Sequence, residues 1–204
     1  AEKSVIQIEG NKLLRGLEWI TPIHKSIREE IPLLISYKSF KAKDAKDGIY
    51  YPYLLKEYRN RWFVICKPKK GATLITLALD RIQEVQEMAK AGFVAYKGVD
   101  FERYYADTIG VTKSERDRAQ RVILEIDAYN APYVETKPIH SSQEVLEKKE
   151  NGNILIRIDV VLNFELEREL LGFGDSIKIL SPARLQSRIS SRLKKAWQQY
   201  VEKK

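Results

Sequence analysis

The sequence predicts an α+β protein: a small antiparallel β-barrel, then a ferredoxin-like α/β extension that ends in a long helix. In the first half, four strand-like runs joined by short turns fall within about 50 residues, which is typical of small barrels. In the second half, predicted strands and helices follow the order β-α-β-β-α-β of ferredoxin-like folds. Between them, residues 112–118 are all polar. The predicted domains are therefore a first domain at 1–95, a linker at 96–118 and an extension at 119–204.

The first domain opens with an apolar alternation at 4–10, predicted as a strand or an arm. Ile23, Ile27 and Ile31 recur every four residues, which predicts a helix within 13–31. Four runs rich in β-branched and aromatic residues predict strands at 33–40, 49–58, 61–67 and 72–82. Pro52 predicts an edge or a bulge in the second strand, and Arg59-Asn60 can form the two-residue turn that follows it.

The linker is predicted to contain a short helix within 99–111, because Phe101, Tyr104, Tyr105 and Ile109 fall on one side of a helix. In the extension, Asn151-Gly152 predicts the turn of a hairpin, and Pro182 predicts the first position of the last helix. Its predicted elements are a strand at 119–126, a helix at 131–138, a hairpin at 143–162, a helix at 164–174, a strand at 176–181 and a helix at 182–204.

The net charge of the chain is +8, and most of the excess lies in residues 1–95, where 17 Lys and Arg face 11 Asp and Glu. Such an excess favours polyanionic partners, although it also serves solubility alone. The single cysteine, Cys66, excludes a disulfide within the chain and argues against a metal cluster. No signal peptide and no apolar run of 18 residues is present, so we expect a cytoplasmic protein that does not engage a membrane.

Motifs that carry catalysis are absent from the sequence. His24 and His140 lack a partner motif, and there is no glycine-rich phosphate loop, HExxH or G-x-S-x-G pattern. We therefore expect a protein without catalytic residues, metal or cofactor, and keep an enzyme acting on nucleic acid as the weaker alternative.

Aromatic and basic residues gather on the predicted strands and near their turns. Rings of this kind stack on bases and guanidinium groups grip phosphate, so these residues are candidates for binding an anionic ligand. The candidates are Tyr37, Ser39, Tyr51, Tyr53, Arg59, Arg61, Trp62 and Arg81. The alternative is a barrel core of Tyr and Trp with a solvated basic rim. Arg81 is either paired, with Asp80 or Glu84, or exposed to a ligand.

The segments "ISYKSF", "YYPYLLKEYRNRWFVI" and "LALDRIQEV" within 35–85 resemble the WYL domain. Trp62-Phe63-Val64 stand where that family has its Trp-Tyr-Leu run. The other matching positions are the Tyr of the first strand, Tyr37, the Pro of the next strand, Pro52, and the closing Arg-Ile pair, Arg81-Ile82. The segment "FGDSIKILSPARLQSRISSRLKKAWQQY" at 173–200 is similar to the WCX-type extension that follows WYL domains. The resemblance covers nearly the whole chain.

The resemblance implies an Sm-like barrel of a bacterial transcription regulator, usually placed behind an N-terminal winged helix-turn-helix. It implies a ligand-sensing module that binds a nucleotide or a nucleic acid, such as single-stranded DNA, and controls DNA binding by a homodimer. The implied pocket residues are Tyr37, Tyr51, Arg61, Trp62 and Arg81. Phe63 lacks the hydroxyl of the family tyrosine, and Ile75 stands where the family usually has an arginine. A module for protein–protein interaction or dimerisation, without a nucleotide ligand, is the alternative. Whether the chain is a piece of a longer regulator stays open.

Overall fold

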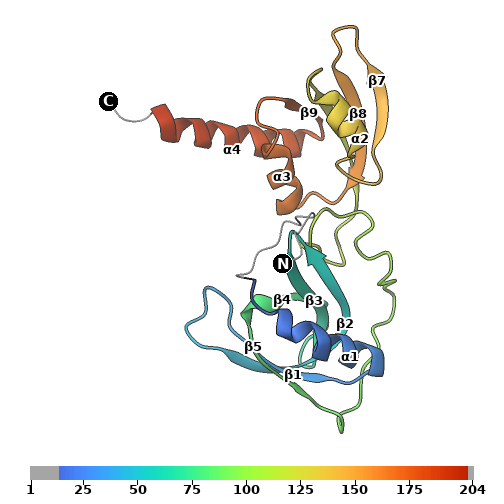
Figure 1. Ribbon diagram of the computed structural model, residues 1–204, viewed down its shortest axis with the longest axis vertical. Helices are drawn as coiled ribbons and strands as arrows, with labels where there is room; N and C mark the ends of the chain where they lie inside the picture. Colours follow the sequence, from blue (N-terminus) through green and yellow to red (C-terminus); the bar gives the residue numbers. More distant parts are fainter. Residues whose placement is uncertain (1–13, 202–204) are drawn as a thin grey trace, which may run out of the picture. The chain divides into compact units, whose positions relative to one another are not determined.

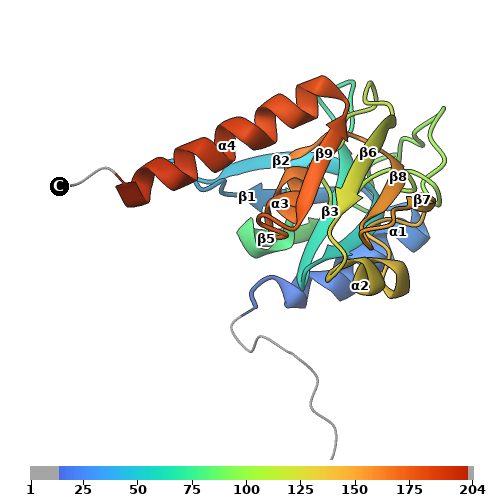
Figure 2. The same ribbon diagram turned by 90° about the horizontal axis from the view of Figure 1, so that it is seen from above.

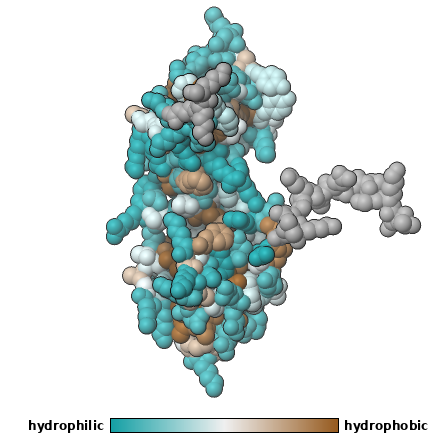
Figure 3. Space-filling view, turned by 90° about the vertical axis from the view of Figure 1, so that its left-hand side faces the viewer, coloured by the Kyte–Doolittle hydropathy of each residue, from teal (hydrophilic) through white to brown (hydrophobic). Residues whose placement is uncertain are grey.

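The structure, a computed structural model, describes residues 14–201 and divides between Phe101 and Glu102 into two units. This boundary falls inside the predicted linker. The strand or arm predicted at 4–10 lies outside the described residues, as do the last three residues of the predicted C-terminal helix. The face seen in Figure 3 is mainly hydrophilic and carries small separate hydrophobic patches.

The first unit is a five-stranded antiparallel sheet with the strand order β4-β3-β2-β1-β5, accompanied by helix α1 (Figure 1). Ile23 of α1 is fully buried against the sheet, in agreement with the predicted helix. The elements are η1 (Leu17–Trp19), α1 (Ile20–Glu29), β1 (Leu33–Tyr37), β2 (Lys46–Tyr58), β3 (Arg61–Pro68), β4 (Ile75–Ala78), η2 (Leu79–Arg81) and β5 (Ile82–Glu87).

The prediction of a single strand at 72–82 was wrong. The chain turns through the 3-10 helix η2, whose flanking residues Ala78 and Ile82 are both extended. It then returns as β5, which pairs with β1. No glycine or proline marks this turn, so the sequence carries no local signal for it; burial of Leu79, which is 1% exposed, helps to fix it instead.

The predicted barrel is not closed, because no ladder joins β4 to β5 among the described strands. Instead β2, at 13 residues, pairs with β1 through its first part and with β3 through its last part. The register shifts between Pro52 and Leu54, which agrees with the second of the two alternatives, an edge or a bulge, that Pro52 predicts. Arg59 and Asn60 both adopt positive φ, 50° and 65°, as the predicted two-residue turn requires.

The second unit is a four-stranded antiparallel sheet with the order β7-β8-β6-β9. With two crossover helices this is the ferredoxin-like arrangement that the element order predicts. Its core joins the strands to α2, α3 and the first turns of α4. The elements are β6 (Gln120–Ile126), α2 (Ala131–Thr136), β7 (Glu144–Lys148), β8 (Ile154–Val160), α3 (Phe164–Leu171), β9 (Ile177–Ser181) and α4 (Ala183–Val201).

The short helix predicted within 99–111 was wrong, because residues 101–107 form turns. The end of this segment is fastened to α3 instead. Asn163 Nδ2 donates to the carbonyl oxygens of Ile109 and Thr112, at 2.8 and 3.0 Å. Oε1 of the buried Glu165 accepts from Thr112 N and Oγ1, at 3.1 and 2.8 Å. The segment that leads into the second unit is therefore anchored by side chains rather than by helical hydrogen bonds.

None of the helices within residues 14–201 combines the length and the apolar character needed to cross a membrane.

Candidate anion-binding site

Two arginines share one carboxylate beside the turn η2. Asp80 Oδ2 lies 3.7 Å from Nε of Arg61, the first residue of β3, and Asp80 Oδ1 lies 3.9 Å from Nε of Arg81. The Asp80 and Arg81 side chains are 18% and 27% exposed, whereas that of Arg61 is 53% exposed. Two guanidinium groups against one carboxylate leave a local positive charge at the surface.

The Arg81 guanidinium also lies against an aromatic ring. Its central carbon is 4.1 Å from the ring centroid of Phe40, whose side chain is otherwise 74% exposed. Arg81 Nε is buried and makes no hydrogen bond to another described residue, because 3.9 Å to Asp80 is too long for one. A guanidinium that is held in place by stacking on a ring, and whose side chain is still 27% exposed, is suited to an incoming anion.

A cavity of about 640 Å³ lies beside Arg81. Its lining comes from three segments, within residues 14–18, 38–42 and 80–83. The charged residues among them are three cations, Arg15, Lys38 and Arg81, and two carboxylates, Glu18 and Asp80. Its volume lies in the range usual for small-molecule sites, about 300–1,000 Å³.

Gly16 and Trp19 place one wall of this cavity. Gly16 has a φ of +85°, and a Cβ there would meet the carbonyl carbon of Leu79 at 2.4 Å, so only glycine lets the segment approach η2. Trp19 Nε1 donates to the carbonyl oxygen of Ile82 at 3.2 Å. The segment before α1 is thereby held against the turn that carries Asp80 and Arg81.

The structure brings four of the eight predicted site residues to η2 or the cavity beside it. Besides Arg61 and Arg81, Ser39 lines the cavity, and the Tyr37 hydroxyl accepts a long hydrogen bond of 3.4 Å from Ala78 N. Of the two alternatives for Arg81, the structure shows the pairing with Asp80, and Arg81 also lines the cavity.

The other four lie elsewhere. Tyr51 and Tyr53 contact the rings of Phe93 and Phe101, not the residues of the cavity. The Arg59 guanidinium lies over the Tyr58 ring, 5.6 Å from its centroid, in the exposed hairpin turn. Trp62 packs against the core of the first unit. The predicted single face therefore separates into a cavity, an aromatic cluster and core packing.

Phe40 and Asp80 belong to the site but are not among the candidates predicted from the sequence. The sequence predicts Phe40 as the end of the first strand, whereas the strand stops at Tyr37. An exposed phenylalanine next to a charged loop, "KAKDAKDG", was the available signal. Within residues 14–201, no three His, Cys, Asp or Glu side chains are grouped so that they could hold a metal ion. Cys66 is fully buried, and burial raises the pKa of its thiol.

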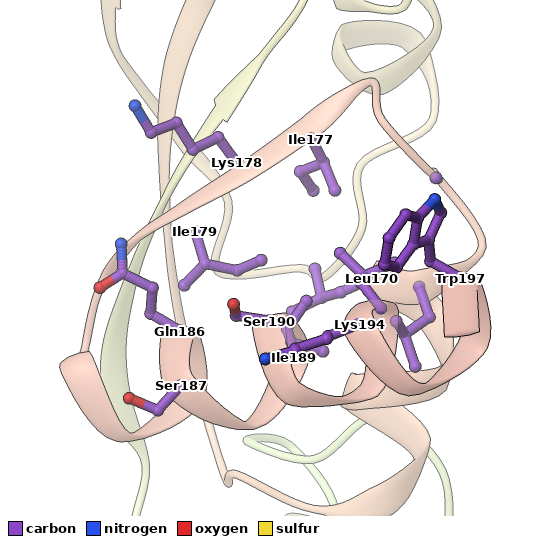
Figure 4. Close-up of a pocket in the computed structure, with 13 residues that line it drawn as sticks. Leu170, Ile177, Lys178, Ile179, Gln186, Ser187, Ile189, Ser190, Lys194 and Trp197 are labelled. Carbon is purple, nitrogen blue, oxygen red and sulfur yellow. The ribbon is translucent and has the colours of Figure 1, made fainter. Parts of the chain in front are cut away.

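A second cavity, of about 680 Å³, lies in the other unit between α4, β9 and the end of α3. Figure 4 shows Leu170 and Trp197 at one end of it and Gln186 at the other. Its lining is mainly apolar, and among residues 14–201 the charged ones that line it are Lys178 and Lys194.

Comparison with known proteins gives two family matches. Residues 18–87 match the model of the WYL domain, and residues 118–197 match that of the WCX domain. No curated protein sequence matches the chain.

Two solved structures resemble the chain over 92% of its length. One is proteasome accessory factor B/C (PafBC) of Arthrobacter aurescens, with 20% identity and a TM-score of 0.38. The other is a CRISPR Cas-related protein, with 12% identity and a TM-score of 0.49. The match covers 28% of the first of these chains and 54% of the second.

Proposed function

This chain belongs to the proteins that join a WYL domain to a WCX domain, and we propose that it is the effector-sensing part of a bacterial transcription regulator. The effector is an unpaired nucleic acid or a nucleotide, bound at the Arg61–Asp80–Arg81 site in the cytoplasm without catalysis. The observation that carries this proposal is the pair of arginines on one carboxylate, with the Arg81 guanidinium held on Phe40 beside an open cavity.

The chemistry of the site supports this ligand class. Guanidinium forks bind phosphate oxygens through charge-assisted hydrogen bonds, and exposed rings stack on unpaired bases. Arg61, Arg81 and Phe40 supply both functions within one small region. The strand order β4-β3-β2-β1-β5 and the way β2 changes partner from β1 to β3 along its length support counting the first unit among the Sm-like barrels.

Regulation follows from linkage: an effector shifts an equilibrium only if it binds one arrangement of the protein better than another. We propose that the full regulator is a homodimer that reads DNA through a winged helix-turn-helix ahead of this chain. The WCX domain passes the effector signal to that dimer.

The experiment is a fluorescence-anisotropy titration of the full chain with a labelled single strand of about 12 nucleotides, a length within the usual span of single-strand-binding barrels. Matched duplex DNA, RNA and cyclic nucleotides are the comparisons. We expect saturable binding of the single strand that weakens steeply as salt rises. A flat response to every one of these ligands would contradict the proposal and favour the interaction module described next.

Helix α4 favours the second candidate function, a protein–protein or dimerisation module. Its apolar residues recur every four positions, from Leu185 and Ile189, which are 0% and 3% exposed, to Leu193 and Trp197, which are 41% and 62% exposed. Figure 2 shows α4 continuing past the strands of its own sheet. An apolar stripe that starts in the core and runs on into solvent is typical of an interaction surface.

We predict that Leu193→Asp together with Trp197→Asp weakens self-association at least tenfold, since each change removes apolar burial and adds a charge there. Sedimentation velocity over a range of concentrations measures it. Ser191→Asp together with Gln199→Asp is the matched control, because these two exposed positions add the same two charges to the same helix away from the stripe. Equal association constants for the double variant and the control would rule out α4 as the dimer contact.

A further inference from the structure

Tyr51 and Tyr53 of β2 are covered by a segment of their own unit. We call residues 93–101 the aromatic strap. Within it, Phe101 stacks on Tyr53 with centroids 5.1 Å apart and planes 15° apart. Phe93 meets Tyr51 and Tyr53 edge-on, at 5.7 and 5.8 Å.

Hydroxyl groups as well as these rings hold the strap. Residues 92–101 form neither helix nor strand. Tyr53 Oη donates to the carbonyl oxygen of Val94 at 2.7 Å, and Tyr96 Oη donates to that of Ala72 at 3.3 Å. Burial raises the pKa of Tyr53 to about 12, so its hydroxyl keeps the donated proton at neutral pH.

The rings beneath the strap lie apart from the main core cluster of the unit. Neither Tyr51 nor Tyr53 is part of the core cluster that α1 and the sheet enclose. Tyr51 is nevertheless only 6% exposed, since the strap covers it, and the Lys67 ammonium lies 5.7 Å from its ring centroid. Without the strap, this part of β2 would present two tyrosine rings and a lysine, which is the composition of a surface that stacks unpaired bases.

We propose that Tyr51 and Tyr53 form a second base-stacking surface, that the strap occupies it in place of bases, and that unpaired bases of the effector displace the strap. This inference rests on the proposed function. The exchange is close to balanced, because a contact between two aromatic side chains and a base stacked on an aromatic side chain contribute free energies of similar size. A ligand that is also anchored at Arg61 and Arg81 has the advantage over the strap.

Displacement of the strap would affect the second unit through the residues that connect the two units. The strap ends at Phe101, where the first unit ends, and the segment that follows is fastened to α3 at residues 109–112. Binding in the WYL domain therefore changes the state of the residues that lead directly into the WCX domain.

The test uses the full chain and a strand of about 12 thymidines. Phe101→Ala removes the stacked ring of the competitor, so we expect about fivefold tighter binding, as the binding-competent fraction rises. Val99→Ala, in the same strap but without a ring, is the matched control and should bind as the original chain does. Tyr53→Ala should weaken binding.

Hydrogen exchange of the unsubstituted chain gives a second readout that does not depend on how a variant folds. Amides of residues 92–101 should exchange faster when the strand is bound. Binding that requires Arg81 but leaves both this exchange and the Phe101→Ala affinity unchanged would overturn the inference and leave the proposed function standing. If the original chain does not bind the strand at all, both fail.

Discussion

Replacing Arg81 with alanine is expected to weaken binding of a single-stranded oligonucleotide about 10- to 100-fold. A hydrogen bond to a charged group contributes about 1.5–3 kcal/mol, and every 1.4 kcal/mol is a factor of ten in Kd. The change also leaves Asp80 with Arg61 as its remaining arginine partner, at 3.7 Å, so the carboxylate repels phosphate more strongly. The measurement is the same anisotropy titration, at a single fixed salt concentration.

Two further variants isolate the cause. Arg81→Lys keeps the charge but loses the planar fork and its stacking on Phe40, so it should recover only part of the affinity. Arg116→Ala removes the same charge from an exposed position of the second unit and should change Kd less than threefold by general electrostatics alone. Equal losses from Arg116→Ala and Arg81→Ala would mean that net charge, not this site, accounts for binding.

The second large effect concerns stability. Glu167 on α3 has a side chain that is 4% exposed and pairs with Arg188 and Arg192 of α4; Arg192 Nη1 lies 2.8 Å from its Oε2. Removing one partner of a buried ion pair costs about 3–5 kcal/mol because a charge is left buried and unpaired. Here both arginines are 41% exposed and can regain water, so we expect Glu167→Ala to lower the free energy of unfolding by about 2–3 kcal/mol.

Urea denaturation followed by circular dichroism measures this loss. Glu135→Ala is the control, because Glu135 forms an exposed ion pair with Lys148, at 2.6 Å, with side chains 33% and 67% exposed. Such surface pairs contribute about 0–1 kcal/mol. If the two substitutions lower the free energy of unfolding equally, the pairing of α3 with α4 through Glu167 contributes no more to stability than an exposed ion pair does.

The fold could be predicted from the sequence wherever its cause is local. The hairpin turns at Arg59-Asn60 and at Asn151-Gly152 place Asn60 and Gly152 at positive φ, which Asn and Gly tolerate better than other residues do. The ferredoxin-like order follows from the alternation of hydrophobic periods. The turn η2 could not be predicted, because buried Leu79 helps to fix it and no breaker residue marks it. The false helix within 99–111 has a related cause. Phe101 packs on Tyr53 in the first unit, whereas the carbonyl groups of Asp107 and Ile109 accept hydrogen bonds from Val161 and Asn163 of the second unit. The apolar residues of this segment therefore have helical spacing without forming a helix.

The candidate site was predictable in part. The resemblance and the strand pattern selected Tyr37, Arg61 and Arg81, which the structure places around η2. The shared carboxylate of Asp80 and the stacking of Phe40 depend on side-chain contacts across the fold, which spacing along the chain does not encode. The cover over Tyr51 and Tyr53 is of the same kind, since it comes from rings that lie about 40–50 positions further along the chain.

The salt dependence of binding tests the central claim most directly. Each phosphate contact on a single strand contributes about 0.7 to the slope of log K against log salt. If Arg61 and Arg81 each grip one phosphate, the Arg61→Ala, Arg81→Ala double variant should show a slope about 1.4 smaller than that of the original chain. Affinity should also be lower at every salt concentration. A double variant with the slope and the affinity of the original chain would contradict an effector site at these two arginines.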